Sequence, residues 1–468
     1  FRFRTPELRL LDRSKQNELI VPVRNSGENQ YAGNLRHRLH NQHPGHNREI
    51  GEVAGEERLI GGYILDPDDT LLFQFDNRIN QKHGIAVRKN VADGLDVKNG
   101  HKYGKRRLVE KTKPTTKPLL YQAMPSVLDF VKREQPAIIA MIREFVECES
   151  PSDDAAAVNR FVDLAASKVA GSAKVKTLPG GRFGKHLRCE FTLPGRKKEG
   201  QILVLAHSDT VWPMGTLSTM PFRQDKGRLW GPGVLDMKSG IVFFLFAMRA
   251  LRELDMPVQR KVLLQINSDE EVGSESSRPL TEEAARKSNA VLVLEPGTGL
   301  EGKLKTARKG VGDYSVQVHG KASHAGVDFQ NGASAVVELA RQIEKIAGFT
   351  QLERGITVNP GVVAGGTRTN VVAAEARVEV DIRVARLKDA PALDRKFHAL
   401  KAVDKRCRVE VTGGLNRPPM ERTAAVVRLF QQAKELAASL GVEIEESATG
   451  GGSDGNFTAA LGVPTLDG

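Results

Sequence analysis

Three short apolar runs constrain the fold of this chain more than any other feature of its sequence. They span 201–207, 261–266 and 290–294. The first ends on a histidine, and acidic residues follow within a few positions of each run. Between the first two lies a mostly apolar stretch, 239–254, with the length of a buried helix. Short buried strands that alternate with helices predict an α/β fold, in which a mainly parallel sheet carries helices on both faces.

The stretch 307–417 has a different pattern. Residues 313–320 and 370–384 alternate between polar and apolar side chains, as half-exposed strands do, whereas 334–348 has the spacing of an amphipathic helix. We therefore expect an inserted α+β domain at 307–417. It divides a first domain into a part at 124–306 and a second, incomplete part at 418–468, where a further helix at 424–441 and a final strand follow.

Residues 1–123 contain no methionine and show no lasting periodicity. We expect them to be a disordered or non-native extension, with the functional protein starting near Met124. Pro44 and Gly45 interrupt the helix that a metal-binding histidine face would require. We therefore assign no site to the histidines that recur there every three residues, which are His37, His40, His43 and His46.

Composition excludes several classes of protein. No apolar run approaches the 18 residues of a membrane span. The three cysteines indicate neither a disulfide framework nor a cysteine zinc site. More than half of the net charge of +12 lies in residues 1–120, and no basic stripe is interleaved with aromatic residues, so we expect no nucleic-acid partner. No signal peptide follows Met124, which favours a cytoplasmic protein and leaves a periplasmic one open.

Residues capable of metal chemistry follow the predicted strands, apart from Asp236, which lies in a glycine-containing loop immediately before a predicted helix. Ligands of open α/β sheets bind beyond the carboxyl ends of the strands, where these side chains would meet. Several carboxylates in one cleft repel each other unless a cation lies between them, and mixed histidine and carboxylate ligands suit zinc, with manganese or cobalt as substitutes. The residues concerned are His207, Asp209, Asp236, Glu270, Glu271 and Glu295.

Five of these residues also have a purely structural interpretation. His207 could be a satisfied core histidine, and Asp236 could cap the helix that follows it. Glu295, before a proline, could lie in a solvated turn, and Glu270 and Glu271 could form a charged loop. The metal site is favoured because the four segments that contain these residues, around His207, Asp236, Glu270 and Glu295, occur in order and in the same context at strand ends.

Five motifs together resemble those of a known family. HSDTV, GPGVLDMKSG, NSDEEVGS, LEPG and GKASHAG are similar to segments of the dinuclear zinc amidohydrolases and metallopeptidases of the aminoacylase–carboxypeptidase superfamily. The chain looks most like the branch of the bacterial glutamate carboxypeptidases. The resemblance covers about 124–468 and implies a zinc-peptidase-like catalytic domain with an inserted lid, or dimerisation, domain.

The resemblance implies a set of ligands for two zinc ions. Asp236 would bridge the ions, and His207 and Glu295 would complete the protein ligands of one. Glu271 would bind the other, together with a histidine that this family carries beyond the position of Gly468. On this interpretation the chain is a C-terminally truncated fragment that lacks one ligand, and we expect it to have weak or no activity.

The resemblance also implies catalytic roles. Glu270 would be the general base that takes a proton from the attacking water and passes it to the leaving amine. Asp209 would orient His207 and raise its basicity. His324, in the lid domain, would reach the active site of a partner subunit and stabilise the oxyanion, which implies a homodimer formed through the lid.

The implied substrate is a small peptide or N-acyl amino acid with a free carboxylate beside the scissile amide, from which C-terminal glutamate would be released. The substrate carboxylates would be bound by the residues that match polar and basic positions of that branch, which are Lys303, Asn370, Arg383 and Arg417. Deacylation of an N-acetyl or N-succinyl amino acid is an alternative within the class. A non-catalytic amino-acid or peptide-binding protein on the same fold is an alternative outside it, although the presence of Glu270 and His207 favours an enzyme.

Overall fold

The computed structural model describes residues 58–60, 63–65 and 117–468. Strands β1 (Arg58–Ile60) and β2 (Tyr63–Leu65) pair antiparallel as a small unit of their own. The first turns of helix α2 (Lys117–Glu147) also belong to the described part of 1–123. That helix begins before Met124. The remaining predictions for 1–123, including those for its four histidines, lie outside the described residues.

An eight-stranded sheet forms the larger part of the structure. Its strand order is β15-β10-β16-β9-β5-β8-β4-β3. The pairs from β16 to β8 are parallel, as is β10 with β15, whereas β10 with β16, β8 with β4 and β4 with β3 are antiparallel. The strands are β3 (Ala173–Pro179), β4 (Lys185–Phe191), β5 (Gln201–His207), β8 (Lys261–Asn267), β9 (Ala290–Val293), β10 (Leu304–Arg308), β15 (Glu446–Thr449) and β16 (Thr465–Asp467).

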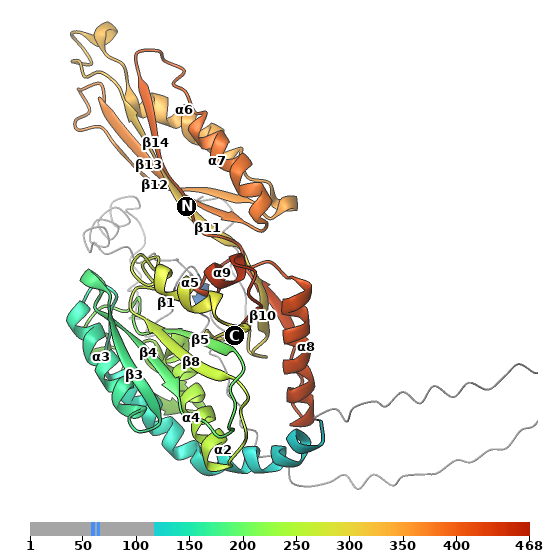
Figure 1. Ribbon diagram of the computed structural model, residues 1–468. Coiled ribbons are helices and arrows are strands. Elements are labelled where there is room, and N and C mark those ends of the chain that lie inside the picture. The colour runs from blue at the N-terminus through green and yellow to red at the C-terminus, as the bar shows by residue number, and fades with distance from the viewer. Residues whose placement is uncertain (1–57, 61–62, 66–116) are drawn as a thin grey trace, which may run out of the picture. The chain divides into compact units, whose positions relative to one another are not determined.

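Helices cover both faces of this sheet because the central strands are apolar on both. In β5, Val204 and Ala206 belong to one buried cluster, and Leu203 and Leu205 belong to another. The first cluster includes side chains of α2, α3 (Ala155–Lys168) and α4 (Ser239–Glu253), and the second includes side chains of α5 (Arg278–Arg286). The ribbons of these helices are labelled in Figure 1. The predicted mainly parallel sheet with helices on both faces is confirmed.

A separate antiparallel sheet lies between β10 and α8 (Ala424–Ser439) in the chain; we call residues 310–417 the inserted unit (Figure 1). Its strand order is β12-β13-β11-β14. The helices α6 (Ala335–Ala347) and α7 (Ala390–His398) share one core with this sheet, in which the rings of Tyr314 and Phe397 stack 3.8 Å apart. The strands are β11 (Gly310–His319), β12 (Thr357–Gly365), β13 (Glu375–Val384) and β14 (Arg408–Arg417).

Shorter elements complete the described chain. Strands β6 (Arg223–Asp225) and β7 (Arg228–Trp230) form a hairpin, and a π-helical turn, Val234–Lys238, leads directly into α4. Helix α9 (Gly455–Ala460) precedes the final strand, β16. None of the helices in the described ranges combines the length and apolar character that crossing a bilayer requires.

Candidate active site

The candidate site forms at the carboxyl ends of three neighbouring parallel strands. Strand β5 lies between β8 and β9 and ends on His207. Glu270 and Glu271 lie in the turn that follows β8, and Glu295 lies two residues beyond the end of β9. Because β5 is central, its histidine is placed between the acids that the two outer strands supply.

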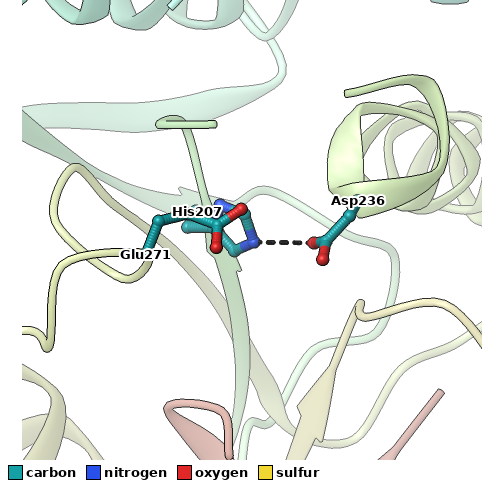
Figure 2. A group of neighbouring side chains, drawn as sticks. All are labelled: His207, Asp236 and Glu271. Atoms are coloured by element: carbon teal, nitrogen blue, oxygen red, sulfur yellow. Dashed lines mark hydrogen bonds and ion pairs between the residues drawn. The ribbon is translucent and has the colours of Figure 1, made fainter. Parts of the chain in front are cut away.

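His207 is the centre of the cluster (Figure 2). Its Nε2 lies 3.0 Å from Asp236 Oδ1 and 3.6 Å from Glu295 Oε1. Ligand atoms of His207, Asp236 and Glu271 all lie within 4.8 Å of one another, and so do those of His207, Glu270 and Glu295. The structure thus brings together all four residues predicted as metal ligands.

The electrostatics of this cluster call for a positive charge between its members. Nδ1 of His207 is 2.8 Å from the carbonyl oxygen of Asp209, to which a proton on Nδ1 would donate. Nε2 would then present a lone pair to the carboxylate oxygen of Asp236, an arrangement stable only with a proton or a cation between them. Burial lowers the pKa of His207, but hydrogen bonds to Asp236 and Glu295 raise it well above its ordinary value. A histidine with several carboxylates is a donor set that fits zinc.

Asp209 stabilises the turn that carries the two glutamates. It is fully buried, and its Oδ1 and Oδ2 accept the backbone N–H groups of Glu270 at 3.2 Å and Glu271 at 3.1 Å. Ser152 Oγ also donates to Oδ2, at 2.9 Å. The carboxylate of Asp209 lies farther from His207 Nδ1, at 3.6 Å, than the carbonyl oxygen of the same residue. Its carboxylate therefore orients the glutamate turn more directly than it orients His207.

Asp236 is positioned by the π-helical turn at the start of α4. Gly233 begins this turn with φ +66°, and a Cβ there would lie 2.8 Å from the Thr210 side chain, so the position suits glycine. Lys238 ends the turn with a buried side chain, whose Nζ donates to the carbonyl of Cys148 at 2.9 Å and lies over the ring of Phe161. Sequence reasoning missed Lys238; a lysine at the start of an apolar helix was the available signal.

The buried glutamates of the site differ in their pKa values. Burial raises the pKa of Glu270 to about 8, against the opposing charge of Arg417, and raises that of Glu271 well above its ordinary value. Burial acts in the same direction on Glu295, but the hydrogen bond to His207 and the charge of Arg308 outweigh it and hold its pKa below the usual range. Neighbouring carboxyls with such different pKa values are typical of sites that combine ligand binding with proton transfer.

Arg417, predicted to bind substrate, contacts the predicted base directly. It is the last residue of β14, and its Nη2 donates to Glu270 Oε1 at 2.9 Å and to the Glu270 carbonyl at 2.8 Å. The same nitrogen donates to Ser274 Oγ at 2.8 Å, and Asp454 lies 3.5 Å away. The inserted unit thus contributes a cation to the glutamate turn.

The other predicted substrate residues have different partners. Lys303 forms an ion pair with Glu445 at 2.7 Å, and Arg383 forms one with Asp381, also at 2.7 Å. The Arg383 side chain also donates to the carbonyl of Gly450, in the glycine-rich loop at 449–456.

His324 and Asn370 lie close together on the inserted unit. The amide of Ala325 donates to the Asn370 carbonyl, and Nδ1 of His324 accepts the amides of Gly326 and Val327. Within the described part of the chain, Lys303, Arg383, His324 and Asn370 form no hydrogen bond or ion pair with the His207 cluster.

A buried ion-pair network behind Glu295 was also missed from the sequence. Arg308 Nη2 lies 3.2 Å from Glu295 Oε2 and 2.7 Å from Asp467 Oδ1, which also accepts Lys305 Nζ at 2.8 Å. Ser453 Oγ donates to the other oxygen of Asp467. Two cations spaced three residues apart in a short strand, β10, were the available signal. The network places a fixed positive charge beside a predicted metal ligand.

Comparison with known proteins identifies the family. The sequence model of the peptidase family M20/M25/M40 matches residues 203–468. Carboxypeptidase G2 of Pseudomonas sp. (strain RS-16) is 30% identical over 345 residues, which cover 71% of this chain and 81% of that protein. A probable carboxypeptidase of Arthroderma benhamiae is 25% identical over 326 residues, covering 63% and 70%.

Solved structures agree in fold. Aminopeptidase PepT of Bacillus cereus superimposes with a TM-score of 0.60 at 23% identity, covering 71% of this chain and 89% of that one. The M20 metallo-carboxypeptidase Sso-CP2 of Sulfolobus solfataricus has a TM-score of 0.54 at 16% identity, covering 70% and 90%. The chain therefore belongs to the peptidase family M20/M25/M40 and is a metal-dependent peptidase.

Proposed function

We propose that the chain is a zinc-dependent hydrolase that cleaves an amide next to a free carboxylate and releases C-terminal glutamate or a similar amino acid. The observation that carries this proposal is the convergence of His207, Asp236, Glu271 and Glu295 at one sheet edge, with Glu270, whose side chain is 11% exposed, beside them. The names of the similar carboxypeptidases support the choice of a C-terminal amide.

The chain's residues have distinct roles in this proposal. Asp236 would bridge two metal ions, since its carboxylate faces His207 and is also near Glu271, and His207 and Glu295 would bind on one side of it. Zinc bound there would polarise the scissile carbonyl and favour ionisation of the attacking water; cobalt or manganese would substitute. Asp209 and Arg308 would hold the turn and Glu295 in place.

Glu270 is assigned as the base. Arg417 Nη2 donates to its Oε1, so the guanidinium holds that oxygen. We assign the other oxygen, Oε2, as the atom that takes a proton from the attacking water and delivers it to the leaving amine.

Residues of the inserted unit and its borders are assigned to recognise substrate. In this proposal residues 307–417 are a lid domain, and 124–306 and 418–468 form the catalytic domain. A substrate carboxylate would replace Glu445 at Lys303 and Asp381 at Arg383, since both pairs are at least partly exposed. Asn370 would add an amide contact, and His324 would act across a homodimer formed through the lid.

The test compares Glu270→Gln with Glu275→Gln, a matched control in the same segment whose carboxylate pairs with exposed Arg182. Each variant is loaded with zinc and assayed on peptidyl-glutamate, N-acyl-glutamate and N-acetyl amino acids. We expect Glu270→Gln to keep its metal and lose about 1,000-fold in kcat, because the general base is gone. Glu275→Gln should behave as the parent protein does. Full activity of Glu270→Gln would refute the role, and activity on N-acetyl amino acids alone would favour a deacylase.

A further inference from the structure

His186 is a fully buried histidine that lies behind the glutamate turn. It belongs to β4, whose pairing with β8 ends at Leu187 and Ile266. Just beyond that point β8 ends at Asn267, and the next backbone amide, that of Ser268, has no strand partner on the β4 side. The side chain of His186 accepts this amide in place of a strand partner.

The hydrogen bonds of His186 define its tautomer. Nδ1 is 3.1 Å from the backbone nitrogen of Ser268 and 2.9 Å from Ser268 Oγ. A backbone N–H can only donate, so Nδ1 must be the unprotonated acceptor. Nε2 therefore carries the proton and donates to Ser276 Oγ, 3.1 Å away. Burial lowers the pKa of His186, although the charge of Asp269 partly opposes this, and the neutral ring that the geometry requires is thereby favoured.

The chain of hydrogen bonds continues to the start of α5. Ser276 Oγ donates to Asp269 Oδ2 at 2.7 Å, and that oxygen also accepts the amides of Ser276 and Ser277. Gly180 packs against the same point, since a Cβ there would lie 2.9 Å from both His186 Nε2 and Ser268 Oγ. The ring therefore links three segments and packs closely against Gly180.

The turn is consequently held from two sides. On one side Asp209 accepts the amides of Glu270 and Glu271, and on the other side His186 accepts the amide of Ser268. A buried amide without an acceptor costs about 1–3 kcal/mol, so the turn would move to find another if the ring were lost. Any such movement is passed to both glutamates, which follow Ser268 by two and three residues.

We propose that His186 is a positioning residue, which sets the place of Glu270 and Glu271 by accepting the Ser268 amide. The inference rests on the proposed function for what the two glutamates do, but the positioning itself concerns only this turn. It differs from a packing role because it needs an acceptor at the Nδ1 position, not only a side chain of suitable volume. Asparagine offers such an acceptor, since its Oδ1 is bonded to Cγ as Nδ1 is, whereas leucine does not.

Hydrogen exchange of the metal-free full chain tests the positioning without reference to activity. We expect His186→Leu to speed exchange of the amides at 268–271 by about 10-fold or more, because the Ser268 amide loses its acceptor. His186→Asn should remain within about threefold of the parent protein. His319→Leu removes a histidine from a strand of the inserted unit and should leave these amides unchanged. If His186→Leu exchanges as the parent does, or if asparagine restores no protection, the proposal is wrong.

Kinetics and a second variant complete the test. Ser276→Ala leaves the ring in place but removes the group that receives its Nε2 proton, so it should increase exchange less than His186→Leu does.

With substrate, His186→Leu should lower kcat by about 10- to 100-fold and change KM by less than about threefold, because misplaced catalytic groups slow chemistry more than binding. His186→Asn should recover most of kcat. An equal rise in KM without loss of kcat would overturn the positioning role. Absence of hydrolysis in the parent protein and in every variant would leave the exchange result to decide the positioning role.

Discussion

The prediction that the structure specifies most fully concerns Glu338, a buried carboxylate on α6 of the inserted unit. It is fully buried and is surrounded by donors. Its Oε1 accepts Gln342 Nε2 at 2.7 Å and the amide of Val403 at 2.8 Å. Its Oε2 accepts the amide of Asp404 and Arg341 Nη1, both at 3.0 Å. The carboxylate thereby ties α6 to the segment that precedes β14.

Replacing Glu338 by glutamine keeps the shape and removes one of its two acceptor oxygens, each of which accepts two hydrogen bonds. In either orientation the new amide group points at two donors, so two hydrogen bonds are lost and an amide is buried unpaired. Hydrogen bonds to charged groups contribute about 1.5–3 kcal/mol each, and relaxation recovers part of the loss. We expect a cost of about 3 kcal/mol, which corresponds to about 100-fold faster opening of this contact, at 1.36 kcal/mol per decade.

Hydrogen exchange of the Val403 and Asp404 amides measures this directly, since both donate to the carboxylate. Arg341→Gln is the milder comparison: the Arg341 side chain is 46% exposed, and its loss removes one donor and leaves the buried carboxylate its other three, so it should cost less than about 1 kcal/mol. If Glu338→Gln exchanged within threefold of the parent chain, or if Arg341→Gln had as large an effect, the reasoning would be refuted.

The same carboxylate predicts a pH dependence. Burial raises the pKa of Glu338, but the amides of Asp404 and Val403 outweigh this and leave the pKa below its ordinary value. A lowered pKa means that the stabilisation is fully present above the ordinary glutamate pKa and is lost as pH falls through the folded-state pKa. Glu338→Gln should therefore reduce the loss of unfolding free energy as the pH falls through the acid range. Denaturant unfolding at a series of pH values measures this.

Three further predictions concern the catalytic region. Zinc should raise the melting temperature of the parent chain but not that of His207→Ala, because His207 belongs to both ligand groups; a shift retained by the variant would contradict this. Asp209→Asn should lower kcat or zinc affinity by about 10- to 100-fold, since its amide cannot accept both turn amides, and titration with zinc alongside kinetics would distinguish the two. Asp467→Asn should cost about 3 kcal/mol in urea unfolding, because Lys305 and Arg308 would keep buried charges without their shared partner; a cost below about 1 kcal/mol would show that other acceptors compensate.

Local patterns in the sequence predicted the fold class and the ligand cluster. The apolar runs at 201–207, 261–266 and 290–294 became the central strands β5, β8 and β9. Parallel strands end at one edge, so any side chain placed just after them is brought to the same region. For this reason His207, Glu270 and Glu295 could be grouped from the sequence without knowledge of packing. Antiparallel β3 and β4 were not anticipated, because much of β3 is exposed and its residues show no buried run.

The partners of individual side chains depended on tertiary structure. Arg417 lies 147 residues from Glu270 in the chain, and His186 lies 82 residues from Ser268. No periodicity connects such pairs, since they meet only when separate strands and the inserted unit have packed. The sequence determined which chemical groups lie at the sheet edge. Tertiary packing decided which of them are buried, which are paired, and how the turn that carries the two glutamates is held, because burial and long-range hydrogen bonds exist only in the folded chain.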